Sequence, residues 1–280
     1  MVSVISPVYN CAPYIRACID SLRAQTWHDF EVLFVDDHGQ DDSMALARAY
    51  TEGDPRFRFL ATPANSGPGV ARNVGIEAAR GEYIAFIDAD DQVCPTFLHQ
   101  LLEATVRVGE TSGHNIDLSY CQLQYRGGSR DGQVHRNPVV NSTDFSVGEK
   151  QYFLRRFVTF SVCFLFRRAF LLDNELRFPA RRNSEDTNFL TRCLLLSGSI
   201  ACTDEPLYYY CVRDNSLTTG RNRRKYRERL DAVNALMRDY QALCRNPRYR
   251  SLQLSRLRPV MALLWLKKGL AQALKELIKL

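Results

Sequence analysis

Residues 2–8, Val2-Ser3-Val4-Ile5-Ser6-Pro7-Val8, form a short apolar run rich in β-branched residues, and Tyr9 and Asn10 follow it directly. Such a run predicts a buried β-strand that ends in a loop. Apolar residues then recur at helical spacing over residues 14–25, and Phe30-Glu31-Val32-Leu33-Phe34-Val35 predicts a second buried strand. Together these segments predict a β-α-β unit with two parallel strands.

The alternation of strands and helices continues along the chain. Regular alternation predicts an α/β fold with a single Rossmann-like, mostly parallel sheet flanked by helices. Up to residue 110, we expect further helices at 43–51, 69–79 and 95–108 and strands at 57–61 and 83–87. Beyond it, we expect strands at 116–125, 158–166 and 208–212, helices at 187–196, 225–243 and 252–280, and a mobile loop at 126–141.

The composition is that of a chain that folds around a hydrophobic core. Hydrophobic residues make up 45% and charged residues 24% of the 280 positions, which excludes collagen-like and wholly disordered classes. The sequence has neither the ~18 consecutive apolar residues of a membrane-spanning helix nor a secretory signal pattern. Its nine scattered cysteines include no Cys-x-x-Cys pair, so we expect mostly small buried side chains and a cytoplasmic protein.

Charge is distributed unevenly along the chain. Residues 221–280 hold 16 basic and 4 acidic side chains, a net +12, whereas residues 1–220 hold 21 and 27, a net −6. The difference predicts an acidic body with a basic helical C-terminal extension. Basic clusters accompany apolar residues at 221–227 and 263–280. Two alternatives follow: the extension lies on the inner face of the cell membrane, or it packs against the body or against a second copy in a homodimer.

Acidic side chains follow two predicted strands where each one ends. Asp36 and Asp37 follow one strand, and Asp88, Asp90 and Asp91 follow another. Because ligands of α/β sheets bind beyond the carboxyl ends of the strands, we expect these acids to share one crevice. Three neighbouring carboxylates repel one another unless a cation lies among them, and Mg²⁺ or Mn²⁺ favours such ligands. The alternative is that Asp90 or Asp91 only caps the following helix.

A second candidate element is the Gly-Pro loop at 65–73, which opens a predicted helix and contains Arg72. The free N–H groups of a helix start and a nearby guanidinium favour an anion. The alternative is an ordinary turn.

Five segments, taken together, resemble one known family. They are Val4–Asn10, Gln25–Trp27, Phe30–Asp37, Gly69–Asn73 and Gly81–Asp91. In this order they resemble the family 2 glycosyltransferases, which have the GT-A fold. Ser184-Glu185-Asp186 and Arg213-Asp214-Asn215-Ser216 resemble the family's more variable acceptor half and extend the resemblance to about residue 217.

The resemblance implies a role for each matching residue. Asp37 would accept a hydrogen bond from the ring N–H of the nucleotide base, and Arg72 would stand near the base or the phosphates. Arg213 would approach the diphosphate. The loop that borders the nucleotide would consist of Pro7, Val8, Tyr9 and Asn10, with Tyr9 packing on the base.

The matching acids would serve metal binding and catalysis. Asp88-Ala89-Asp90 resembles the family's Asp-x-Asp element. There, Asp88 faces the ribose or the hydration shell of the metal, and Asp90 coordinates the Mn²⁺ or Mg²⁺ that holds the diphosphate. Glu185 and Asp186 resemble the family's catalytic acidic pair, with Asp186 as general base. Without the resemblance, these two would be ordinary acids of a helix start.

The function implied by the resemblance is inverting transfer of a sugar from a UDP-sugar to a hydroxyl of a glycan or lipid-linked acceptor, in cell-surface polysaccharide synthesis. Residues 1–110 would form the nucleotide-sugar half of one GT-A domain, 111–220 its acceptor half, and 221–280 the extension. No nucleic acid is expected as a partner. The alternative is a protein without transferase activity that binds nucleic acid or another anionic surface through the basic extension.

Overall fold

The structure is a computed structural model that describes residues 1–110, 113, 115–157, 160–180, 185–213 and 223–265, with the backbone alone for 223–230. Its first part confirms the predicted alternation, because each predicted strand and helix is present within two residues of its expected ends. The elements are β1 (Val2–Val8), α1 (Ile15–Arg23), β2 (Phe30–Asp36), α2 (Ser43–Tyr50), β3 (Phe57–Ala61), α3 (Pro68–Ala78), β4 (Tyr83–Phe86) and α4 (Phe97–Gly109).

The second part is less regular and includes short 3₁₀ helices. Its strands are β5 (Gln92–Val93), β6 (Leu118–Arg126), β7 (Val134–His135), β8 (Phe164–Arg167) and β9 (Ile200–Cys211). Its helices are η1 (Gly128–Arg130), α5 (Val147–Leu154), η2 (Ser161–Cys163), α6 (Arg168–Asp173), α7 (Glu185–Leu196), α8 (Arg223–Arg245), η3 (Pro247–Leu252), η4 (Leu254–Leu257) and α9 (Arg258–Trp265).

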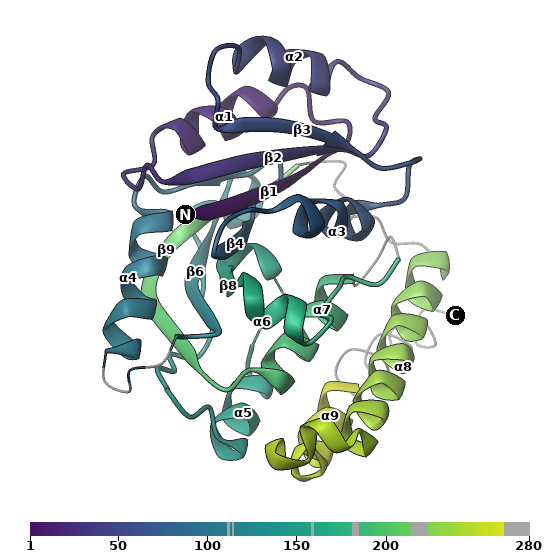
Figure 1. Cartoon of the computed structure of the whole chain (residues 1–280). Coiled ribbons are helices and arrows are strands. Elements are labelled where there is room, and N and C mark those ends of the chain that lie inside the picture. Colours follow the sequence, from purple (N-terminus) through teal and green to yellow (C-terminus); the bar gives the residue numbers. More distant parts are fainter. Residues whose placement is uncertain (111–112, 114, 158–159, 181–184, 214–222, 266–280) are drawn as a thin grey trace.

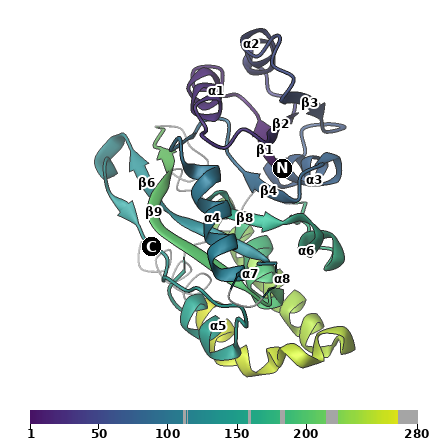
Figure 2. The same cartoon turned by 60° about the vertical axis from the view of Figure 1, so that its left-hand side comes forward.

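The described strands form one sheet in the order β3-β2-β1-β4-β8-β6-β9-β5, with β7 on β6. The first four strands are parallel, as predicted. β8 runs antiparallel to both β4 and β6, and β9 returns parallel to β6. Helices cover both faces (Figures 1 and 2), with α3 on β1 and β2 and α4 on β6 and β9. The carboxyl ends of β1, β2 and β4 therefore lie side by side at one edge.

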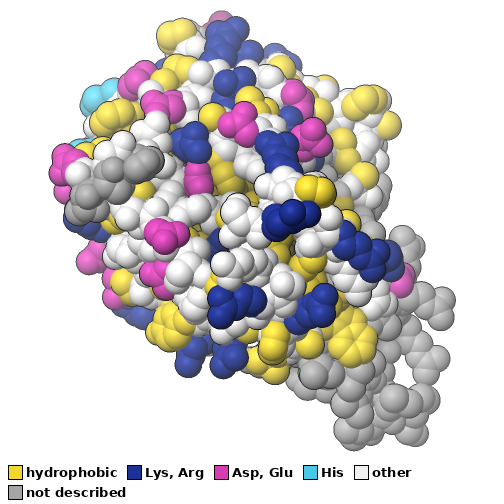
Figure 3. All heavy atoms as spheres, turned by 60° about the horizontal axis from the view of Figure 1, so that its bottom comes forward, with side chains coloured by type: hydrophobic (Ala, Val, Ile, Leu, Met, Phe, Trp, Pro, Cys, Tyr) yellow, Lys and Arg dark blue, Asp and Glu magenta, His cyan; other side chains and the backbone are white. Residues whose placement is uncertain are grey.

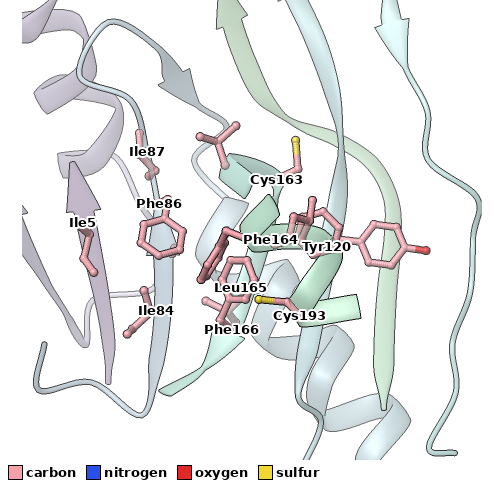
Figure 4. Packing of buried hydrophobic residues seen from close by; sticks show 14 of the residues in the cluster. Ile5, Ile84, Phe86, Ile87, Tyr120, Cys163, Phe164, Leu165, Phe166 and Cys193 are labelled. Atoms are coloured by element: carbon pink, nitrogen blue, oxygen red, sulfur yellow. The ribbon is translucent and has the colours of Figure 1, made fainter. Parts of the chain in front are cut away.

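Aromatic side chains join the two parts of the sheet to α7. Phe86 of β4 packs against Phe166 of β8 with ring centroids 5.5 Å apart (Figure 4). It also packs against Phe189 of α7, at a centroid distance of 5.8 Å. Phe178 stacks on Phe189 with a centroid distance of 3.8 Å. These contacts are worth about 0.5–1.5 kcal/mol each beyond the burial of apolar area. They hold the start of α7 beside the end of β4.

Several boundaries differ from those predicted. The loop expected to be mobile at 126–141 contains η1 and β7, which pairs with β6. The strand expected at 158–166 begins only at Phe164, because residues 161–163 form a 3₁₀ turn; residues 158–159 lie outside the described part. β9 begins at Ile200, eight residues earlier than predicted, because Ile200–Cys202 already pair with β6 and a register shift carries the strand past its polar residues 203–205. Helices α5 and α6 and strand β5 were not predicted.

The described part of the C-terminal extension packs against the body. α8 contacts α7, where Asn188 donates to Asp239 Oδ2 at 2.9 Å, and α9 contacts α5. The long helix expected at 252–280 is broken, because Gln253 has φ 48° and residues 247–257 form 3₁₀ turns before α9. Residues 221–222 and 266–280 of the two basic clusters lie outside the described part. None of the described helices combines the length and apolar character needed to cross a bilayer.

Candidate active site

Three carboxylates lie together just beyond β4. Asp88, Asp90 and Asp91 each offer an oxygen, and these oxygens lie within 4.8 Å of one another. Asp91 is buried; its Oδ2 accepts from the Tyr208 hydroxyl at 2.7 Å and its Oδ1 from the Cys211 amide at 2.8 Å. Burial raises the pKa of Asp91 well above its ordinary value, and the Asp88 charge adds to the effect. Asp91 is therefore a structural member of the cluster.

Tyr208 of β9 fixes this acidic loop from the opposite side. Its buried hydroxyl accepts from the Asp88 amide at 3.2 Å while donating to Asp91. The loop is also held by β5, whose Gln92 and Val93 pair with Tyr209 and Tyr208. The sequence pattern did not single out Tyr208, because its importance arises from a pairing between segments more than 100 residues apart.

Arg72 of α3 is the centre of the site. Its side chain is 3% exposed, and its Nη2 donates to Asp88 Oδ1 at 2.7 Å. Its Nη1 donates to Glu185 Oε1 and Asp186 Oδ1, both at 3.3 Å. Three of the protein's own carboxylates therefore surround the Arg72 guanidinium, and its place near the base or the phosphates stays a prediction. The same three charges raise the pKa of Arg72 against the effect of burial.

A glycine lets α3 approach α7 closely enough for these contacts. A Cβ atom at Gly69 would lie 3.0 Å from the Pro179 carbonyl oxygen and 3.3 Å from Glu185 Cγ. Asn73 then ties α3 to the backbone of Phe178 through two hydrogen bonds of 2.8 and 2.9 Å. Arg72 thus reaches the first turn of α7, where the helix dipole also favours the two acids.

Glu185 and Asp186 differ in their surroundings. The pKa of Glu185 is raised to about 7, because burial and the Asp186 charge, which raise it, outweigh the opposing effect of Arg72. The Asp186 side chain is 23% exposed, and its Oδ1 accepts from the Ser161 hydroxyl at 2.8 Å. Asp186 is therefore the more accessible of the two carboxylates. Sequence reasoning missed Ser161, which no motif marks.

The loops after β1 and β2 are joined by short-range hydrogen bonds. Asn10, with φ 48°, accepts from the Gln40 amide at 2.7 Å, and a Cβ at Gly39 would lie 2.9 Å from the Asn10 nitrogen. Tyr9 is 45% exposed, so its ring is available to stack on a ligand, while Pro7 is half-buried at the end of β1. Val8 and Ala89 belong to the hydrophobic core. Their role towards a nucleotide stays a prediction, and because their side chains are buried, their backbone atoms are the candidates for such a contact.

Asp37 stabilises the neighbouring Gly-Pro loop. Its Oδ1 accepts from the Ser66 amide at 2.8 Å and the Thr62 hydroxyl at 3.0 Å, and its Oδ2 from the Gly67 amide at 2.8 Å. The side chain is buried, so this carboxylate shapes the loop that opens α3. Its role towards a nucleotide base stays a prediction.

Arg213 completes the cluster from the end of β9. Its guanidinium forms an ion pair with Asp90 and lies over the Tyr14 ring at 5.3 Å. The adjoining residues 214–216, which share its motif, and Ser184 before the acidic pair lie outside the described part. The structure thus brings Asp88 and Asp90 together with Arg213 at one end, and Arg72 connects them to Glu185 and Asp186 at the other.

Comparisons with known proteins match the chain to one family. Residues 3–173 match the family model described as glycosyl transferase family 2. The chain is 33% identical over 228 residues to the uncharacterized glycosyltransferase EpsJ of Bacillus subtilis (strain 168), covering 78% of this chain and 63% of EpsJ. It is 32% identical over 247 residues to the succinoglycan biosynthesis protein ExoO of Rhizobium meliloti (strain 1021), covering 87% of this chain and 68% of ExoO. The chain therefore spans less than two thirds of the length of EpsJ.

Solved structures show the same fold. S. aureus TarS 1-349 in complex with UDP superposes with a TM-score of 0.64 at 23% identity, covering 88% of this chain and 66% of that one. The mannosyltransferase PcManGT from Pyrobaculum calidifontis, in complex with GDP-Man and Mn²⁺, gives 0.58 at 17% identity and covers 94% and 73% of the two chains. The expected GT-A fold is confirmed. From the family model and these relatives, the chain belongs to glycosyl transferase family 2.

Proposed function

We propose that this chain is an inverting, metal-dependent glycosyltransferase that moves a sugar from a UDP-sugar to a hydroxyl of a glycan or lipid-linked acceptor in cell-surface polysaccharide synthesis. One observation carries the proposal: Arg72 joins a carboxylate cluster beyond β4 to a second acidic pair at the start of α7. The name of ExoO and the UDP complex of TarS support the pathway class and the nucleotide.

The first cluster suits a hard divalent cation. Its oxygens lie within 4.8 Å of one another, and carboxylate oxygens are the ligands that Mg²⁺ and Mn²⁺ prefer. Asp91 already accepts from Tyr208 and Cys211, so Asp88 and Asp90 would hold the ion. When bound, the cation would offset the negative charge that develops on the leaving diphosphate.

The second cluster suits proton removal from the acceptor. As the hydroxyl oxygen bonds to the anomeric carbon, the bond from that carbon to the diphosphate breaks and the hydroxyl proton passes to Asp186. A well-placed carboxylate contributes about 10²- to 10⁴-fold to such a step. Arg72 donates to Asp186 at 3.3 Å, while Glu185, with its pKa raised to about 7, holds a proton for part of the time at neutral pH. Attack from the side opposite the leaving group inverts the anomeric carbon and needs no covalent intermediate.

The proposal also divides the chain by role. Residues 1–110 would bind the donor through Tyr9, Asn10 and the proposed cation ligands Asp88 and Asp90. Residues 111–220 would supply Asp186 for the acceptor, and residues 221–280 form the extension.

The test is a panel of nucleotide sugars assayed for turnover with Mn²⁺ or Mg²⁺, together with thermal stabilisation by UDP. Asp90→Ala is expected to abolish metal-supported turnover. Asp186→Asn is expected to keep UDP binding and lose transfer by at least about 100-fold. Asp204→Asn, at an exposed ion pair with Arg136, is the matched control. It should leave UDP binding and sugar transfer unchanged. Equal loss of UDP binding in the Asp90 and Asp186 variants would contradict the assigned roles.

A further inference from the structure

We propose that Arg213 is the internal counter-ion of the cation site, so that Arg213 and a divalent cation compete for Asp90. The inference rests on the proposed function, because it concerns the same metal site. It adds a step that the motifs do not imply: Arg213 has to leave Asp90 before the ion can enter.

Each carboxylate of the cluster has a different partner. Asp91 accepts from Tyr208 and Cys211, and Asp88 accepts from Arg72. Within the described part of the chain, the charged partner of Asp90 is Arg213.

These partners differ in how readily they can move away. Arg72 is 3% exposed and holds two further carboxylates, and Tyr208 is fully buried, so neither can withdraw without opening the core. The Arg213 side chain is 28% exposed and has solvent on one side. Asp90 is therefore the ligand whose counter-ion can be exchanged.

Local structure keeps Arg213 near Asp90. The Cys211 amide donates to Asp91 Oδ1 at 2.8 Å and anchors the end of β9 to the acidic loop two residues before Arg213. The Tyr14 ring lies 5.3 Å below the guanidinium, a cation–π arrangement that orients it. The ion pair is thus preorganised on one side and open to water on the other.

Electrostatics makes the two occupants exclusive. A cation held by Asp88 and Asp90 would stand beside the guanidinium as a like charge in a partly desolvated site. Cation binding must therefore weaken the Arg213–Asp90 ion pair, and the ion pair must weaken cation binding by the same factor. Arg213 would hold the site closed in the ligand-free enzyme and be released when the ion binds.

The experiment measures Mn²⁺ affinity of the full chain without any donor, from the electron paramagnetic resonance signal of free Mn²⁺. Arg213→Gln is expected to bind Mn²⁺ about tenfold more tightly, and Arg213→Lys to fall between that variant and the wild type. The matched control is Arg126→Gln, which removes the same charge from β6, where Arg126 contacts Gln92 and the Tyr209 ring. Its affinity should stay at the wild-type value. Melting curves without metal confirm that each variant is folded.

The outcomes separate the two proposals. Unchanged or weaker Mn²⁺ binding by Arg213→Gln, with binding lost in Asp90→Asn, overturns the competition and leaves the metal site standing. Wild-type Mn²⁺ affinity in Asp90→Asn overturns the metal site itself. An equal gain in Mn²⁺ affinity in Arg213→Gln and Arg126→Gln would show a general effect of net charge and would also overturn the competition.

Discussion

At the scale of single residues, the site depends on the balance between one buried cation and three anions. Arg72 is nearly inaccessible, and a guanidinium in such a place is stable only because Asp88, Glu185 and Asp186 compensate its charge. The reverse also holds, since the three acids would repel one another without Arg72. The arrangement therefore stabilises the fold and holds the proposed base, Asp186, beside Arg72 at the same time.

Removing Arg72 tests this balance. Arg72→Ala leaves three carboxylates without their shared partner, and we expect the free energy of unfolding at pH 7.5 to fall by about 3 kcal/mol. Arg72→Lys keeps the charge but loses the two-pronged geometry, so it should recover only part of the loss. Urea unfolding measures both. Equal stability of the wild type and Arg72→Ala would show that the acids have another source of compensation.

The raised pKa of Glu185 predicts a pH-dependent stability. Its ordinary value is 4.5 and its value in the folded chain is about 7, so the folded state keeps a proton that the unfolded state loses. The contribution of Glu185 to the free energy of unfolding is fully present below pH 4.5 and is lost as the pH rises through 7. Between pH 5 and 8, we expect the wild type to lose roughly 2 kcal/mol relative to Glu185→Gln. Unfolding curves of both proteins at the two pH values measure this difference, and parallel pH profiles would contradict the assignment.

The sequence predicted the acidic residues better than their partners. Asp88, Asp90 and Asp91 could be found because the end of a parallel strand is recognisable from an apolar run. Arg72 was recognised as an anion-binding residue, yet two of its three carboxylate partners belong to α7, more than 110 residues away, and the third is Asp88. No sequence pattern marks Tyr208 and Ser161, because the hydrogen bonds of their hydroxyl groups join segments that are far apart in the sequence.

At the scale of elements, the position of α3 decides where Arg72 lies. A Cβ atom at Gly75 would stand 2.3 Å from Ile5 Cγ2, so α3 can lie flat on β1 only with glycine there. We expect Gly75→Ala to destabilise the protein by about 1–3 kcal/mol through overpacking and to lower turnover by displacing Arg72. Thermal unfolding and sugar transfer are the two measurements.

Gly148→Ala of α5 is the matched control for this prediction. Its added Cβ would meet only Ser146 Oγ, at 3.9 Å, so the substitution should raise helix stability by up to about 1 kcal/mol. Destabilisation of equal size at both glycines would mean that close packing on β1 is not the cause.

Elements were predictable where local pattern and tertiary environment agree. Three of the four parallel strands, β1, β2 and β4, are almost entirely buried, so each is a mostly apolar run with clear ends, while β3 at the edge of the sheet is half-buried. β9 has an exposed, polar middle at Asp204 and Glu205, which is typical of a loop, and pairing with β6 overrides that pattern. The break after α8 depends on a left-handed residue, Gln253, and no helical periodicity reveals such a conformation.

At the scale of the whole molecule, the charge is divided between two regions. The acidic cluster lies at the carboxyl edge of the sheet, whereas the extension carries a net +12 over residues 221–280. Figure 3 shows Lys and Arg side chains spread beside hydrophobic ones on the face that lies at the bottom of Figure 1, where α5 and α9 meet. The arginines exposed in the described part of the extension are Arg238, Arg245, Arg248, Arg250, Arg256 and Arg258.

This division predicts binding to anionic membranes. The full chain should co-sediment with vesicles containing phosphatidylglycerol at 50 mM salt and be released at 500 mM, because screening weakens surface attraction. Reversing two exposed arginines, as Arg250→Glu with Arg256→Glu, should weaken binding by at least about tenfold at low salt, since each basic residue near the surface contributes about 1 kcal/mol.

The control reverses two arginines at the other end of the molecule, Arg16 of α1 and Arg48 of α2, which are also exposed. It changes the net charge by the same amount, so a difference between the two double variants reports the orientation of the protein on the membrane. Equal loss in both would show that only total charge matters. Failure of the wild type to bind at low salt would leave the extension with the role that the contacts of α8 and α9 already show, as a helical support packed against α7 and α5.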